Sequence, residues 1–143
     1  MHARCIGVAS VLALVAMGCQ STGDQPFAPL PSLEGTFVGT YSITHGYSTG
    51  SPRTESGGVR LEIVGSHYNL IGERRYMPPS GCGTLHVAES VVFRDECPHT
   101  AEFDWTLIVS GDFSYSHAGD RIILGRFDRR LDRLQRFVLV RVA

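Results

Sequence analysis

Alternation of apolar and polar residues constrains the fold of this chain more than any other feature of its sequence. Phe37, Tyr41 and Ile43 occupy alternate positions, and Thr40 and Ser42 stand between them. A period of two residues places one set of side chains on each face of a β-strand. The same pattern recurs over residues 59–63, 68–72, 85–87, 91–93, 113–115, 122–124 and 137–142. The sequence therefore predicts an all-β protein with one buried face on each strand.

Tight connections between these segments predict how the strands are paired. Gly65-Ser66 and Ala118-Gly119-Asp120 are typical of β-hairpin turns, and no ten-residue segment has a convincing helical period. Consecutive hairpins build an antiparallel meander, and eight such strands can close on themselves and so remove the exposed edges. We expect a small up-and-down barrel of about eight strands over residues 35–143.

Aromatic residues dominate the predicted core. An eight-stranded barrel can be filled by its own side chains or can hold one small ligand, and the sequence leaves both alternatives open. Glycines at inward positions, Gly39 and Gly72, are expected to leave some room inside. Phe103 and Trp105 belong to an extended piece or to a helical turn, and on a strand both would face the core.

An arginine-rich stretch resists the strand pattern. Residues 126–136 hold five arginines and two aspartates, and Phe127, Leu131 and Leu134 fall at helical spacing. A solvated hairpin end is the plainest interpretation, and a single helical turn between the last two strands is another. The arginines also allow a basic patch that contacts anionic lipid or a glycan.

Two cysteines lie within the predicted domain. Cys82 and Cys97 are an even pair, and in an exported protein the usual state of such a pair is a disulfide. A zinc site is the competing hypothesis, with His86 and His99 as further ligands. The spacing of these four residues is not a common zinc pattern, so no metal is expected.

The remaining composition narrows the function. The chain has 13 basic and 14 acidic residues, which gives no long-range field for nucleic acid, and every basic residue is arginine. No nucleophile elbow, metal-ligand cluster or phosphate loop is present. If the segment around Phe103 is an extended strand, Glu102 and Asp104 share one of its faces and could form an acid–base pair, but they are expected to face solvent. We expect neither an enzyme nor a bound cofactor.

The first residues indicate export. An apolar run over residues 6–17 follows Arg4 and is too short to span a bilayer. The stretch from Leu14 to Cys19 resembles the lipobox of bacterial lipoproteins. That resemblance implies a signal peptide over residues 1–18, a lipidated Cys19 as membrane anchor and a flexible proline-rich tether over 19–34. It also implies a bacterial cell envelope location, at the outer membrane or the periplasmic face of the inner membrane. An ordinary secretory signal, cut nearby, is the alternative.

The domain itself resembles lipocalin-like (calycin-like) small envelope lipoproteins. Gly35-Thr36-Phe37, Gly39-Thr40-Tyr41 and the blocks 80–93, 100–107 and 111–116 carry this resemblance. It implies a barrel that binds a small apolar ligand. A non-enzymatic structural or interaction protein, an accessory subunit or inhibitor that acts through its loops, is the alternative. The residues expected to line the ligand are Phe37, Tyr41, Tyr68, Phe93 and Trp105.

Overall fold

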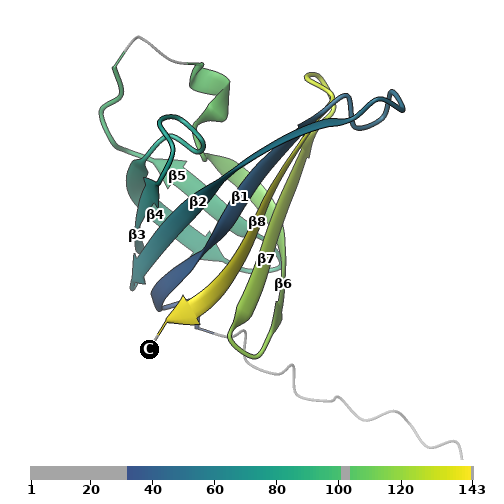
Figure 1. Cartoon of the computed structure of the whole chain (residues 1–143). Helices are drawn as coiled ribbons and strands as arrows, with labels where there is room; N and C mark the ends of the chain where they lie inside the picture. The colour runs from purple at the N-terminus through teal and green to yellow at the C-terminus, as the bar shows by residue number, and fades with distance from the viewer. Residues whose placement is uncertain (1–31, 101–103, 143) are drawn as a thin grey trace, which may run out of the picture.

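The chain folds into a closed barrel of eight antiparallel strands (Figure 1). This computed structural model describes residues 32–100 and 104–142. The elements are β1 (Gly35–His45), β2 (Arg53–Val64), β3 (His67–Gly72), β4 (Gly81–Val87), β5 (Val91–Asp95), the 3-10 turn η1 (Trp105–Leu107), β6 (Gly111–Ala118), β7 (Arg121–Asp128) and β8 (Arg133–Val142). Each strand pairs with the next along the chain, and β8 also pairs with β1. The predicted meander and its closure are confirmed.

The barrel has two unlike ends. The turns β2–β3, β4–β5 and β6–β7 lie at one end together with residues 32–34 and the C-terminus, and we call this the tether end (Figure 1). Gly65 and Gly119 have positive φ angles of 59° and 57° in two of these turns, so the predicted hairpins at both places are confirmed. The connections 46–52, 73–80 and 129–132 lie at the opposite end, together with the described parts of the β5–β6 connection, residues 96–100 and 104–110.

The middle of the barrel is filled by aromatic rings. Tyr41 packs on Phe137 with ring centroids 4.7 Å apart, and Phe137 packs on Phe113 at 5.9 Å. Phe113 lies 5.5 Å from Phe93, which in turn lies 5.0 Å from Tyr68. These five rings form one continuous stack inside the sheet, and each residue is at most 3% exposed. Of the two alternatives left open by the sequence, the structure shows the filled barrel.

The inward glycines do not leave room for a ligand. A β-carbon at Gly39 would collide with the carbonyl oxygen of Val138, and one at Gly72 would collide with the carbonyl oxygen of Pro78. Both positions are therefore occupied by the backbone of a neighbouring segment. The expectation that these glycines create space inside the barrel is wrong, because strands approach more closely where a side chain is absent.

The predicted disulfide is present. Cys82 of β4 is bonded to Cys97, two residues beyond β5, with their α-carbons 5.1 Å apart. The backbone N–H of Glu96 also donates to the carbonyl of Cys82 at 2.8 Å. These links fix the beginning of the connection from β5 to β6. The bonded cysteines exclude the zinc alternative at this pair.

The arginine-rich stretch is a hairpin end. β7 runs to Asp128, a turn covers residues 129–132, and β8 begins at Arg133, four residues before the predicted strand. Asp128 Oδ1 accepts hydrogen bonds from the backbone N–H groups of Arg130 and Leu131 at 2.9 and 3.2 Å. An aspartate that bonds backbone two residues ahead favours a turn over a helix. No helix within residues 32–100 and 104–142 is long and apolar enough to cross a bilayer.

Candidate functional site

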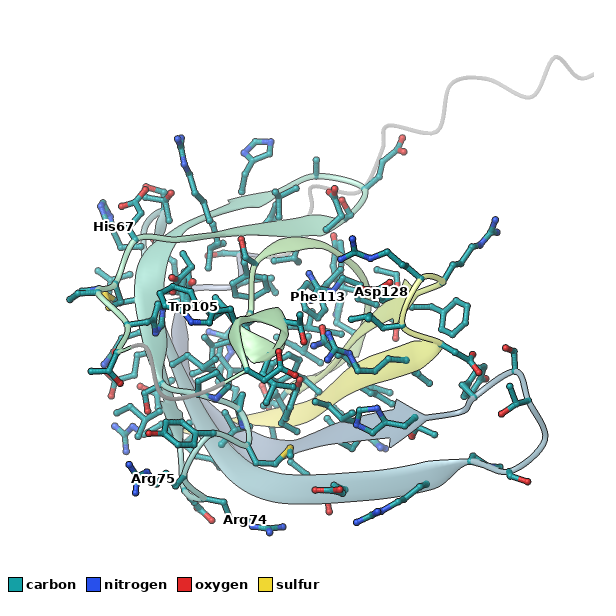
Figure 2. All side chains as sticks on the ribbon, turned by 90° about the horizontal axis from the view of Figure 1, so that it is seen from above. His67, Arg74, Arg75, Trp105, Phe113 and Asp128 are labelled. Carbon is teal, nitrogen blue, oxygen red and sulfur yellow. A yellow bond between two sulfur atoms is a disulfide. The ribbon has the colours of Figure 1, made fainter. Side chains whose placement is uncertain are left out.

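A short segment closes one end of the barrel. Seen from above, η1 lies over the middle of the ring of strands (Figure 2). We call residues 104–110 the plug and this end of the barrel the plugged end. Leu107 packs against the core and Val109 is 3% exposed, so the plug is held from below by apolar contacts. The plug therefore belongs to the folded barrel and does not merely rest on its surface.

Asp104 shapes the plug. Its Oδ1 accepts a hydrogen bond from the Thr106 backbone N–H at 2.8 Å and another from the Thr106 hydroxyl at 2.6 Å. These bonds hold the pKa of the Asp104 carboxyl below its usual range. The capped turn leaves Trp105 54% exposed, so the expectation of a buried Trp105 on a strand is wrong. A capping aspartate favours a helical turn, which rotates Trp105 away from the core.

Two arginines from the last hairpin hold the plug from the side. Arg133 donates from Nη1 to the Thr106 hydroxyl at 2.9 Å and from Nη2 to the Thr106 carbonyl at 2.6 Å. Arg126 donates from Nη1 to the Ser110 carbonyl. Its Nε and Nη2 donate to Gln135 Oε1 at 2.9 and 2.5 Å. Both guanidinium groups are thus fixed by hydrogen bonds to neutral oxygen atoms.

Asp104 and Asp128 act on Arg133 and Arg126 electrostatically, but without direct contact. Among the residues that the structure describes, neither guanidinium has a carboxylate oxygen within 4 Å. Arg133 is only 3% exposed and Arg126 is partly buried. Burial lowers the pKa of Arg126, and Arg133 lowers it further, against the opposing influence of Tyr41 and Asp128. Two like charges therefore share a poorly solvated space, which is costly unless a counter-charge is present.

Buried polar atoms lie beside these arginines. Arg133 Nε has no hydrogen-bond partner, while the Gln135 side chain and the Tyr41 hydroxyl, both at most 1% exposed, are close enough to interact with each other. Burial raises the pKa of the Tyr41 hydroxyl, and Arg133 and Arg126 are close enough to oppose this shift. The hydroxyl is therefore protonated at neutral pH and can donate. We call Tyr41, Arg126, Arg133 and Gln135 the polar cluster.

An open cleft of about 770 Å³ lies between the plug and the end of the last hairpin. We call it the plug cleft. Its lining residues are Asp95, Trp105, Thr106, Ile108, Ser110, Arg126, Phe127, Asp128, Arg129, Arg130, Leu131 and Arg133. Four arginines face two aspartates there, so the cleft carries a positive balance. Trp105, Phe127 and Leu131 are 54%, 41% and 38% exposed, which gives the same cleft an apolar wall.

A buried histidine–aspartate pair, His99 and Asp95, lies beside the plug cleft. His99 Nε2 lies 2.6 Å from Asp95 Oδ2, and their side chains are 7% and 11% exposed. The Tyr68 hydroxyl donates to the carbonyl of Val109 at 3.4 Å. Burial raises the pKa of Tyr68, and Asp95 and Glu96 add to this effect. These contacts tie the β5–β6 connection to the barrel.

The structure separates the five residues expected to line a ligand. Phe37, Tyr41, Tyr68 and Phe93 lie in the filled core, while Trp105 lies on the plug cleft. Their role toward a ligand stays a prediction. Of the suggested carboxylate pair, Asp104 is exposed as expected but caps a turn, and Glu102 lies outside the described residues. Cys19 also lies outside them.

The sequence analysis did not identify Arg126 and Arg133 as residues of the candidate site. The signal was available, because Arg133 and Gln135 extend the alternation of Phe137 and Leu139 on β8 toward the start of that strand. Four positions two residues apart share one face of a strand, so the first two also point into the barrel. The charge of the stretch concealed this pattern.

Comparison of the chain with protein-family models, curated proteins and solved structures finds no significant match in any of the three. The eight-stranded antiparallel barrel is compatible with a lipocalin-like fold. The candidate site is therefore argued from its own residues.

Proposed function

We propose that this protein is a lipid-anchored binding protein of a bacterial envelope, with a small, partly apolar ligand held in the plug cleft. The observation that supports this function is the cleft itself, which has a volume within the range of small-molecule sites and combines apolar side chains with a few fixed polar groups. The filled barrel interior excludes the deep apolar cavity that the lipocalin-like resemblance implies. The proposed ligand therefore binds at the end of the barrel.

The position of the tether fits this proposal. Residues 32–34 lie at the end of the barrel opposite the plug, where Arg141 donates to the carbonyl oxygens of Glu34 and Ser32. A membrane anchor at Cys19 would therefore attach the tether end and leave the plug cleft facing away from the bilayer. Such an orientation would leave the cleft open to the surrounding compartment.

Membrane attachment is tested by fractionation. Wild type and Cys19→Ala are expressed in a bacterium with lipoprotein processing, and the membrane and soluble fractions are compared. The wild type is expected in the membrane fraction and Cys19→Ala in the soluble one, because two or more acyl chains give stable attachment. Equal release of both proteins would contradict the anchor.

Ligand binding is tested on the domain without its leader. Native mass spectrometry of the protein, purified without detergent, is expected to show an added mass that disappears on denaturation. Trp105 is the single tryptophan of the chain and lines the cleft, so its fluorescence reports occupancy directly. Addition of the extracted ligand to stripped protein should change this fluorescence saturably. The small-ligand proposal would be contradicted if the purified protein carries no added mass and its Trp105 fluorescence does not change when envelope lipid extracts are added.

A second candidate function is contact with another protein through the plugged end. Tyr47 of the β1–β2 loop is 54% exposed and packs on Phe127 with ring centroids 5.6 Å apart. These two rings extend the apolar wall beyond the plug cleft, and aromatic residues are enriched at protein interfaces. Tyr47→Ala separates the two functions, because Tyr47 does not line the cleft. The variant should weaken a protein complex but leave the response of Trp105 to a small ligand unchanged.

A further inference from the structure

Within the described residues, the two guanidinium groups of the polar cluster have no direct ion pair. These groups carry formal positive charges, and their hydrogen bonds run to carbonyl, hydroxyl and amide oxygens only. Neutral partners satisfy donors, but they do not compensate a buried charge. Asp128 acts electrostatically on Arg126 and Asp104 acts on Arg133, but neither carboxylate forms a direct ion pair with its arginine. An anion from outside would supply what the described residues do not.

Arg133 Nε is a donor without a partner, although Arg133 lines the cleft and is only 3% exposed. A buried donor without a partner is rare in folded proteins and requires an explanation. One acceptor with several lone pairs would satisfy such a group, and a carboxylate or phosphate is that kind of acceptor.

Fixing the plug does not account for both arginines. That role uses the Arg133 Nη atoms and Arg126 Nη1, and neutral donors would serve it as well. It leaves the Arg133 Nε without a partner and, within the described residues, neither guanidinium in a direct ion pair. A structural role would also favour a carboxylate opposite each guanidinium, since charge-assisted bonds are stronger than neutral ones.

We infer that the plug cleft recognises an amphiphile with an oxyanion headgroup, a carboxylate or a phosphate, seated at Arg126 and Arg133 with its apolar chain against Trp105, Ile108 and Leu131. This inference rests on the proposed function, because it names the ligand class of the same cleft. The apolar wall distinguishes the ligand from a free inorganic ion. The two arginines distinguish it from a neutral lipid, which would offer them no charge-assisted bond, and from a cation, which they would repel.

The first test compares ligands on the wild-type protein. Decanoate, decyl phosphate and decanol are titrated, each below the concentration at which it forms micelles, and Trp105 fluorescence is recorded. Decanoate and decyl phosphate are expected to bind about tenfold more tightly than decanol or better, because only they offer charge-assisted bonds to the guanidinium groups. The relative affinities of decanoate and decyl phosphate then show whether the cleft prefers a carboxylate or a phosphate headgroup.

The second test removes one positive charge from the plug cleft. Arg126→Gln keeps a donor beside Ser110 and Gln135 but removes one charge, and it should bring decanoate and decanol affinities to within about threefold of each other. Arg136→Gln is the matched control, since Arg136 lies on the same strand as Arg133 but is exposed on the outer face. It should keep the wild-type preference. Circular dichroism confirms that both variants fold.

The outcomes separate the two levels of the proposal. Equal binding of decanoate and decanol to the wild type would overturn the oxyanion inference and leave the small-ligand function standing. No fluorescence response to any of the three compounds would overturn both. A preference for decanoate that survives Arg126→Gln unchanged would place the headgroup elsewhere and would also overturn the inference. The first two of these outcomes are measured on the wild-type protein alone, so they do not depend on the folding of a variant.

Discussion

The two ends of the barrel satisfy their polar groups very differently. At the tether end, Arg141 donates to two backbone carbonyls and lies over the ring of Phe37 at 4.9 Å, with Leu33 closing the core at 6% exposure. Among the described residues, the buried side-chain atoms without a partner are Tyr41 Oη, Asp95 Oδ1, Asp132 Oδ2, Arg133 Nε and Gln135 Nε2. All five residues belong to the plugged half of the barrel. Folding alone does not require this concentration.

The difference indicates a division of labour within one small domain. Short turns and the buried side chains of Leu33 and Phe37 close the tether half, while the plugged half holds long connections and unsatisfied polar atoms. Each unsatisfied buried group costs about 1–3 kcal/mol, so a domain keeps several at one end only when another property depends on them. The predictions that follow test whether stability and binding divide between the two halves in this way.

The largest effect on stability is expected in the tether half. Phe37→Ala should lower the free energy of unfolding by about 3–5 kcal/mol, because Phe37 is fully buried and its removal leaves a cavity in the hydrophobic core. Urea denaturation followed by circular dichroism measures the change. Val38→Ala is the matched control on the outer face, where the side chain is 38% exposed, and it should cost about 1 kcal/mol or less. Similar losses of stability in Phe37→Ala and Val38→Ala would contradict the proposed role of the tether half.

The next largest effect comes from the disulfide that anchors the β5–β6 connection. The Cys82–Cys97 bond spans 15 residues, so its loss should reduce the stability by about 3 kcal/mol. Denaturation of the protein with and without a reductant measures this, and peptide mapping under non-reducing conditions identifies the bond. Two free thiols in protein isolated from the envelope would contradict it.

Tyr41→Phe should be close to neutral although Tyr41 is as deeply buried as Phe37. Its ring packing on Phe137 is retained, and the hydroxyl loses only its interaction with the Gln135 side chain. We therefore expect a change in the free energy of unfolding of about 1 kcal/mol or less. If the hydroxyl donates to a bound headgroup, the same variant should weaken decanoate binding severalfold. A large loss of stability would show instead that the hydroxyl is satisfied within the folded protein.

Trp105→Ala should also leave stability nearly unchanged, by about 1 kcal/mol or less, because Trp105 is 54% exposed. Its emission in the free protein should be red-shifted and readily quenched by iodide. Decanoate should shift the emission to the blue and protect it from quenching. A blue-shifted, protected Trp105 without any ligand would restore the buried position that the alternation suggested.

The sequence predicted the tether half better than the plugged half for a physical reason. Period-2 alternation reports burial on a strand, and it located Phe37, Phe93 and Phe137 correctly. It failed at Trp105, where a capping aspartate changes the local conformation, and at Arg133, where a charged residue occupies an inward position. Hydrophobic patterns carry no information on buried polar groups, because such groups depend on partners that lie far apart along the chain.

The smallest effect concerns the pH dependence of the plug. The hydrogen bonds from Thr106 lower the pKa of Asp104 in the folded protein below 3.8, its ordinary value. A carboxyl with a lowered folded pKa stabilises the protein fully above its unfolded pKa and loses that contribution as pH falls through the folded pKa. We therefore expect a weaker plug below about pH 4, seen as a change in Trp105 emission while the circular dichroism of the barrel is unchanged. Asp104→Asn keeps an oxygen acceptor but cannot titrate, so its Trp105 emission should not respond over the same pH range. An identical acid response in wild type and Asp104→Asn would assign the transition to another group.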